Sequence, residues 1–192
     1  MALIKSISGI RGTIGGKPGE GLSPLDIVKF SAAYGAWVLE NSPNKKIILG
    51  RDARISGQMV SQLVASTLQG LGLHVIDLGL STTPTVELAV PKENAGGGII
   101  ITASHNPIQW NALKLLNAQG EFISDSEGKE VLDKAEKEDF TFAEVRKLGS
   151  YTQREDYLDI HIQHVLDLAL VDKEAIAARK FKVVIDCVNS SG

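Results

Sequence analysis

The segment TASHNP, residues 102–107, places Ser104 directly before His105 at the end of the apolar run GGIIITA. A serine beside a histidine could indicate a hydrolase, but the G-x-S-x-G motif is absent, and neighbours on a turn seldom align as a catalytic triad. A serine on an exposed loop can instead carry a phosphoryl group, with a charge of about −1.5 to −2 at neutral pH. Such a group needs cations, a metal ion or backbone donors nearby.

Four basic side chains could neutralise that charge. Lys114 lies at the start of the next expected strand, and Arg11 lies in SGIRG, whose glycines let the backbone approach a ligand closely. Arg51 and Arg54 follow another expected strand. Each alone could be a solvated surface charge, but their shared place near strand ends favours a common role.

The elements expected to position these residues alternate between strand and helix. Strands are expected at residues 46–50, 74–78, 98–103 and 113–116, and helices at 23–41, 56–71, 85–90 and 124–137. This alternation predicts an α/β fold, a layered α/β/α domain with a mixed, mostly parallel sheet. Ligands of such sheets bind at the carboxyl ends of the strands, where the loops at 51–54, 81–84 and 102–107 are expected to converge.

The composition is that of an ordinary soluble globular protein. The 192 residues are 43% hydrophobic and 22% charged, enough to bury a core, and the net charge of −3 gives no overall attraction to nucleic acid or membrane. No apolar run approaches the roughly 20 residues of a membrane span. Cys187 is the only cysteine, so an intrachain disulfide is excluded. These features predict a cytoplasmic protein.

The C-terminal quarter indicates a second unit. A long helix is expected from residue 151 to about 170, and the apolar run at 182–187 reads as a new strand that buries Cys187. A strand without further elements cannot complete a sheet, so we expect residues 1–150 to form one domain. Residues 151–192 then form a linking helix and the first strand of a truncated second α/β domain.

The pattern TASHNPxxxNxxK, from Thr102 to Lys114, resembles the phosphoserine loop of the α-D-phosphohexomutases. This family includes phosphoglucomutases, phosphomannomutases and phosphoglucosamine mutases. SGIRG, GRDAR followed by SG at 56–57, and TTPT at 82–85 resemble further loops of the family, in the same order. The resemblance covers most of the chain as the family's first domain. Trp110 and Ala112 replace the family's frequent Tyr and Gly, and both read as packing changes on the loop.

The resemblance implies interconversion of hexose 1-phosphate and hexose 6-phosphate through a phosphoserine and a bisphosphorylated sugar intermediate. Ser104 would carry the phosphoryl group and, through it, ligate Mg²⁺. Lys114 would act as a general acid/base or stabilise charge, and His105 would orient groups or assist proton transfer. The phosphate- or substrate-binding residues implied are Arg11, Arg51, Asn106, Asn111 and Lys114, with both asparagines also holding the loop's shape.

Several alternatives stay open at this stage. The implied activity is first that of a phosphoglucomutase/phosphomannomutase, and second that of a phosphoglucosamine mutase of amino-sugar and cell-wall precursor synthesis. A non-catalytic module that binds phosphosugars is a third reading. The family's Asp-rich metal loop, DGDxDR, is absent from the sequence, so the chain alone is expected to be inactive. The expected partners are the hexose phosphates, with no nucleic acid or membrane; the sequence does not determine the oligomeric state.

Overall fold

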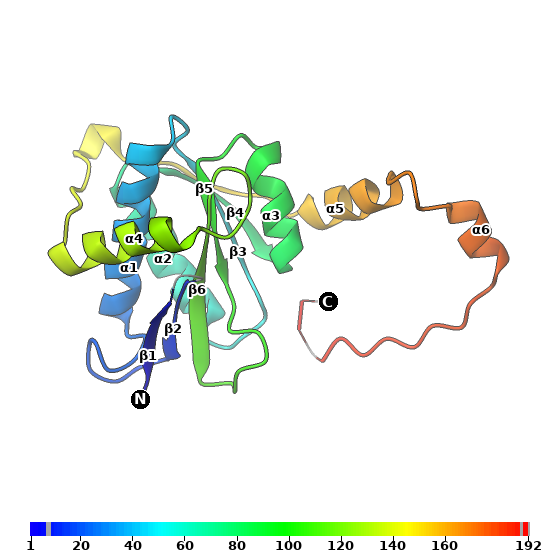
Figure 1. The fold of residues 1–192 in the computed structure, drawn as a ribbon, viewed down its shortest axis with the longest axis horizontal. Helices are drawn as coiled ribbons and strands as arrows, with labels where there is room; N and C mark the ends of the chain where they lie inside the picture. Colours follow the sequence, from blue (N-terminus) through cyan, green and yellow to red (C-terminus); the bar gives the residue numbers. More distant parts are fainter. Residues whose placement is uncertain (7–8, 189, 192) are drawn as a thin grey trace.

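The computed structural model describes residues 1–6, 9–188 and 190–191, and these form an α/β structure around a seven-stranded mixed sheet (Figure 1). The strand order is β1-β2-β6-β5-β3-β4-β7. The bounds are β1 Leu3–Ser6, β2 Gly9–Thr13, β3 Lys46–Arg51, β4 His74–Leu80, β5 Gly97–Ile101, β6 Trp110–Leu116 and β7 Tyr151–Gln153. Strand β3 pairs in parallel with β4 and β5, and β4 with β7, whereas β1-β2, β2-β6 and β5-β6 are antiparallel. The expected mixed sheet is confirmed, with its antiparallel part at the N-terminal edge.

Helices α1 to α4 cover both faces of this sheet, and α5 and α6 follow β7. The bounds of the helices are α1 Pro24–Asn41, α2 Gly57–Gly70, α3 Thr83–Lys92, α4 Asp125–Lys137, α5 Tyr157–Leu166 and α6 Lys173–Ala178, with a 3₁₀ turn at Val145–Lys147. On one face α1, α2 and α4 pack in the same apolar cluster as Ile47 and Leu49 of β3. On the other face α3 and Tyr157 pack with Ile48. Because successive strand residues point to opposite faces, β3 is buried on both, which confirms the layered α/β/α arrangement.

The carboxyl ends of β3, β4 and β5 lie at one edge of the sheet, as expected for parallel neighbours. The Ser81 amide donates to the carbonyl oxygen of Arg51 at 2.9 Å, and the Asp52 amide donates to that of Ile101 at 3.1 Å. The three loops that follow these strands are therefore joined by hydrogen bonds, and the predicted convergence is confirmed.

The N-terminal strands and β7 are elements that the sequence did not indicate. Residues 151–153 form β7 rather than the start of a helix, so that part of the helix prediction was wrong. The Tyr151 hydroxyl donates to Oδ2 of Asp77 at 2.8 Å, and the Arg154 amide donates to the Asp77 carbonyl at 2.8 Å. These contacts align the segment with β4, and the helix α5 begins only at Tyr157.

The expected strand at 182–187 does not form. This segment is irregular, and the exposed fractions of Val183, Val184 and Ile185 lie between 72 and 97%. Cys187 is exposed rather than buried. The physical reason is that a strand needs a neighbour for its backbone groups, and none of the described strands pairs with this segment. Figure 1 shows α5 and α6 leading away from the sheet on the α3 side, and the segment after α6 turning back toward the sheet.

No helix in the described part of the chain has both the length and the apolar character needed to cross a bilayer.

Candidate functional site

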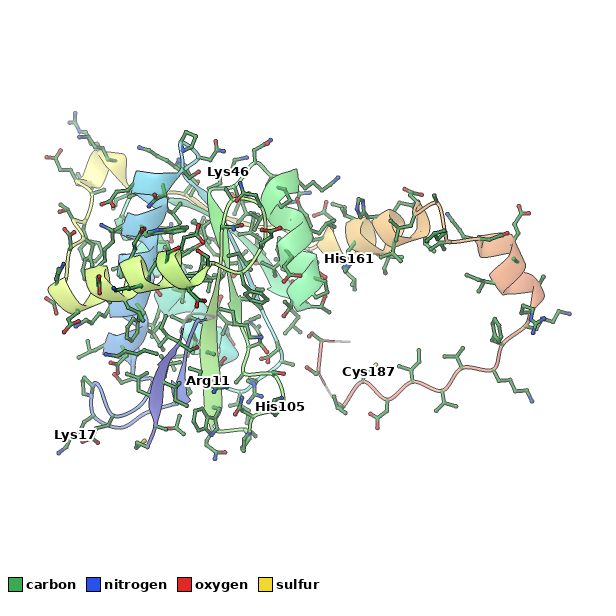
Figure 2. The ribbon with its side chains drawn as sticks, viewed as in Figure 1. Arg11, Lys17, Lys46, His105, His161 and Cys187 are labelled. Carbon is green, nitrogen blue, oxygen red and sulfur yellow. The ribbon has the colours of Figure 1, made fainter. Side chains whose placement is uncertain are left out.

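A cleft of about 370 Å³ lies where the β5–β6 loop meets β2 and Ser6 at the end of β1. It brings together five of the predicted site residues: Arg11, Ser104, His105, Asn106 and Lys114. Figure 2 shows Arg11 and His105 at the same end of the molecule, although they lie 94 positions apart in the sequence. The cleft therefore assembles the serine and two of the four basic residues considered from the sequence.

The pairing of β2 with β6 sets the two cations of the cleft on one face. Arg11 lies opposite Ala112 in the antiparallel register, and Lys114 follows Ala112 by two positions, so all three side chains share a face. Gly9 allows the close approach of the strands, since a Cβ there would meet the carbonyl oxygen of Leu113, and its φ is +130°. The glycine noted in SGIRG thus serves strand packing beside the cleft. Ser8 of that motif lies outside the described residues.

Ser104 is exposed at a tight turn in a left-handed conformation, with φ of 54°. The Asn106 amide donates to the Ala103 carbonyl at 3.0 Å, and the Asn106 side chain donates to the same oxygen at 2.8 Å. The Ser104 amide donates to the Thr102 hydroxyl oxygen at 3.1 Å. A non-glycine residue in this region is uncommon and often belongs to a functional site, and here it presents the serine on a fixed turn.

An ion pair beneath the loop connects it to the end of β3. Arg54 Nε lies 3.2 Å from Oδ2 of Asp52, and both side chains are at least 85% buried. The Thr102 hydroxyl donates to the same carboxylate oxygen at 2.6 Å. Arg54 also donates to backbone carbonyls of the loop. Sequence reasoning missed Thr102, whose place just before Ser104 at the strand end was the available signal.

Two predicted binding residues lie outside the cleft. Asn111 is fully buried, its side-chain amide donates to Ser56 Oγ at 2.9 Å, and its oxygen accepts from the Ala112 amide at 2.8 Å. The expectation that it binds substrate conflicts with this burial, whereas its role in holding the loop's shape agrees with these bonds. Arg51 does not line the cleft either, and its guanidinium donates to the Asp52 carbonyl at 3.3 Å; phosphate binding by Arg51 stays a prediction.

Comparison with known proteins identifies the family. Residues 3–142 match the profile of phosphoglucomutase/phosphomannomutase, alpha/beta/alpha domain I. The chain belongs to this family. It is 33% identical over its whole length to the phosphoglucosamine/phosphogalactosamine mutase of Sulfurisphaera tokodaii, and 34% identical over 94% of its length to the phosphoglucomutase/phosphomannomutase of Thermococcus kodakarensis. In both cases the match covers 40% of the relative, so the chain spans about two fifths of their length.

Solved structures of the phosphoglucomutase/phosphomannomutase family share the fold. A family protein from Burkholderia thailandensis superposes with a TM-score of 0.70 over 88% of this chain and 38% of its own, at 22% identity. A putative phosphomannomutase from Thermus thermophilus gives a TM-score of 0.68 over 84% of this chain and 36% of its own, at 26% identity. The mixed sheet with helices on both faces is therefore the fold of this family's first domain.

Enzymes of this family generally use a metal ion, and the described residues do not make a site for one by themselves. No group of three or more His, Cys, Asp or Glu side chains in the described ranges could hold a metal ion. The carboxylate of Asp52, which is hydrogen-bonded to Thr102 just before the serine, also accepts from Arg54. No chemical step through a metal follows from these residues.

Proposed function

We propose that Ser104 carries a phosphoryl group and that the protein containing this chain is a phosphohexomutase. The observation that carries the proposal is the placement of an exposed serine, held at φ of 54°, in one cleft with Arg11 and Lys114. A phosphoryl group on Ser104 would have two cations from β2 and β6 beside it, as a dianion requires.

The substrates proposed are hexose 1-phosphate and hexose 6-phosphate. Phosphorylated Ser104 donates its phosphoryl group to the free hydroxyl of a sugar monophosphate: the P–Oγ bond breaks and a P–O bond to the sugar forms. The resulting bisphosphorylated sugar then returns its other phosphoryl group to Ser104. Lys114 exchanges the proton of the reacting hydroxyl or offsets the developing charge, His105 assists at the cleft mouth, and Arg11 holds phosphate.

The sugar specificity we propose first is for glucose and mannose phosphates, the substrates in the name of the T. kodakarensis relative. A second candidate is amino-sugar phosphates, which is favoured by a specific observation. Several relatives that match nearly the whole chain at 28 to 32% identity are named phosphoglucosamine mutases. The cleft residues are compatible with both, because they bind phosphate rather than the sugar ring.

The proposal extends to the cofactor, the compartment and the domain plan. We assign Mg²⁺ as the metal, with a phosphoryl oxygen on Ser104 as one ligand and the others outside the described residues. We assign residues 1–150 to the first domain, 151–192 to the link and the start of a second, and the protein to the cytoplasm. The 192 residues alone are proposed to be inactive, because they match only 40% of the length of the relatives.

The test compares two serine variants in the protein at its natural length. Ser104→Ala removes the proposed carrier, and Ser126→Ala removes an exposed serine of α4. We expect Ser104→Ala to lose mutase turnover with glucose 1-phosphate, mannose 1-phosphate and glucosamine 1-phosphate, and Ser126→Ala to match the wild type on the sugar that it uses. Wild-type turnover by Ser104→Ala would refute the phosphoryl-carrier role.

A further inference from the structure

All five N–H donors of the Arg54 guanidinium group are hydrogen-bonded, four of them to the loop that carries Ser104. Arginine has five N–H donors in a planar fork, and the Nε donor binds Asp52 Oδ2 at 3.2 Å. The other four donors bind backbone carbonyl oxygens of the loop. These oxygens belong to Pro107 and Trp110, at 2.9 and 3.0 Å from Nη1, and to Ser104 and Asn106, at 2.7 and 2.8 Å from Nη2.

This arrangement separates Arg54 from the other arginines near the cleft. Its side chain is only 12% exposed, and its five donors have five acceptors. No N–H is left for a phosphate, so charge neutralisation of the substrate falls to Arg11 and Lys114, which line the cleft. The chemistry of Arg54 is that of a clamp on the backbone.

We propose that Arg54 is a positioning residue that sets the conformation of residues 103–110 and thereby aims Ser104 for phosphoryl transfer. This inference rests on the proposed role of Ser104. It assigns to Arg54 a function distinct from phosphate binding, for which arginines beside such a loop are otherwise the obvious candidates.

Arg54 changes the electrostatic environment of Ser104 by binding the carbonyl oxygens of the loop. Carbonyl oxygens carry partial negative charge and repel a phosphoryl group, and Arg54 gathers four of them on its own side. The described peptide bonds are trans, so the amide that follows the Ser104 carbonyl, that of His105, points away from Arg54. No described residue accepts a hydrogen bond from this His105 amide. The His105 amide can therefore donate a hydrogen bond to an anion bound at the loop.

The clamp also acts on the strain of the loop. A left-handed conformation is strained for a non-glycine residue, and it persists where the surrounding structure holds the residue from several sides. Arg54 holds the carbonyl of Ser104, and the Thr102 hydroxyl holds its amide. Lysine cannot make the same set of hydrogen bonds, because an ammonium group has three donors and lacks the planar arrangement of a guanidinium group.

The experiment measures kcat and KM of the natural-length protein for Arg54→Ala, Arg54→Lys and the matched control Arg146→Ala, an exposed arginine of the 3₁₀ turn. We expect both Arg54 variants to lose about 100-fold in kcat, the scale of an ångström-sized misplacement. KM should stay within about threefold, because phosphate contacts are kept. Added guanidinium ion at millimolar concentration should restore part of the kcat of Arg54→Ala alone.

Three outcomes decide the inference. A kcat for either folded Arg54 variant within about threefold of wild type, or a loss confined to KM, overturns the positioning role. If Arg54→Ala fails to fold by circular dichroism, Arg54→Lys, which keeps the charge and the aliphatic stem, decides by the same kinetic criterion. Ser104→Ala is measured in parallel: if it retains turnover, the proposed function fails, whereas an inactive Ser104→Ala with a fully active Arg54→Ala refutes only the clamp.

Discussion

The hydroxyl of Thr102 donates a 2.6 Å hydrogen bond to the carboxylate of Asp52 across two neighbouring parallel strands, β5 and β3. The same hydroxyl oxygen accepts from the Ser104 amide at 3.1 Å. One side chain thus connects the end of β3 to the residue proposed to carry the phosphoryl group. The loop that carries Ser104 is therefore fixed by a side-chain contact to the end of β3 as well as by the hydrogen bonds within its turn.

Thr102→Val keeps the side-chain shape and removes this hydroxyl. We expect the free energy of unfolding to fall by about 1.5–3 kcal/mol, because a largely buried carboxylate loses a donor. Urea denaturation followed by circular dichroism measures the loss. Thr152→Val, in the exposed strand β7, is the matched control, and equal stability of the two variants would show that the bond contributes nothing.

Lys114→Met keeps the length of the side chain and removes its charge from the cleft. We expect kcat of the natural-length protein to fall by roughly 100-fold or more, the usual scale for a lost acid/base group. Lys129→Met, on the exposed face of α4, should leave turnover unchanged. Equal kcat values for the two variants would remove Lys114 from the reaction.

All three tyrosines of the chain are expected to ionise abnormally late. Burial, and then the hydrogen bond to Asp77, raise the pKa of Tyr151 to about 12. Burial also raises the pKa of Tyr34 and, together with the bond to Glu93, that of Tyr157. The native state therefore binds more protons than the unfolded state above the ordinary value of about 10. The contribution of these tyrosines to the free energy of unfolding is fully present below pH 10, and it is lost as the pH rises towards 12.

Tyrosinate absorbance during an alkaline titration checks this expectation. The native chain should show no tyrosinate near pH 10, and the chain unfolded in urea should show all three tyrosines titrating there. A native tyrosine that ionises near pH 10 would contradict the raised values.

Cys187 is expected to react as a free surface thiol in the 192-residue chain. The structure leaves it exposed on the irregular segment after α6. A thiol-reactive dye should label one group per chain in native buffer, at a rate within about threefold of that in denaturant, since an exposed thiol is accessible to the dye in both states. Labelling only after unfolding would show that the segment packs against the domain.

The parts of the fold that sequence predicts are those with a local cause. Ser23 caps α1 in a capping box with Asp26, Pro24 is the first residue of the helix, and the apolar residues 47–49 are the buried centre of the sheet. The strand at 151–153 and the failure of 182–187 depend on neighbours instead. Tyr151 pairs because Asp77 accepts its hydroxyl, and Val184 stays exposed because no described strand lies beside it.

The sequence likewise predicted some residues of the candidate site and missed the contacts of others. Two family motifs, SGIRG and TASHNPxxxNxxK, predicted Arg11, Ser104, His105, Asn106 and Lys114 as site residues, and the structure brings these five together in one cleft. The motifs did not show that Asn111 is buried or that Arg51 lies outside the lining of the cleft. The clamp of Arg54 has no sequence signature, because its acceptors are backbone carbonyls that every residue possesses.

The most direct measurement is the mass of the peptide that contains Ser104, taken from the natural-length protein after incubation with glucose 1,6-bisphosphate. The account predicts one phosphoryl group on Ser104, which disappears when excess sugar monophosphate is added and the bisphosphate forms. An enzyme that turns over while Ser104 stays unmodified, with phosphate on another residue or on none, would contradict the central claim.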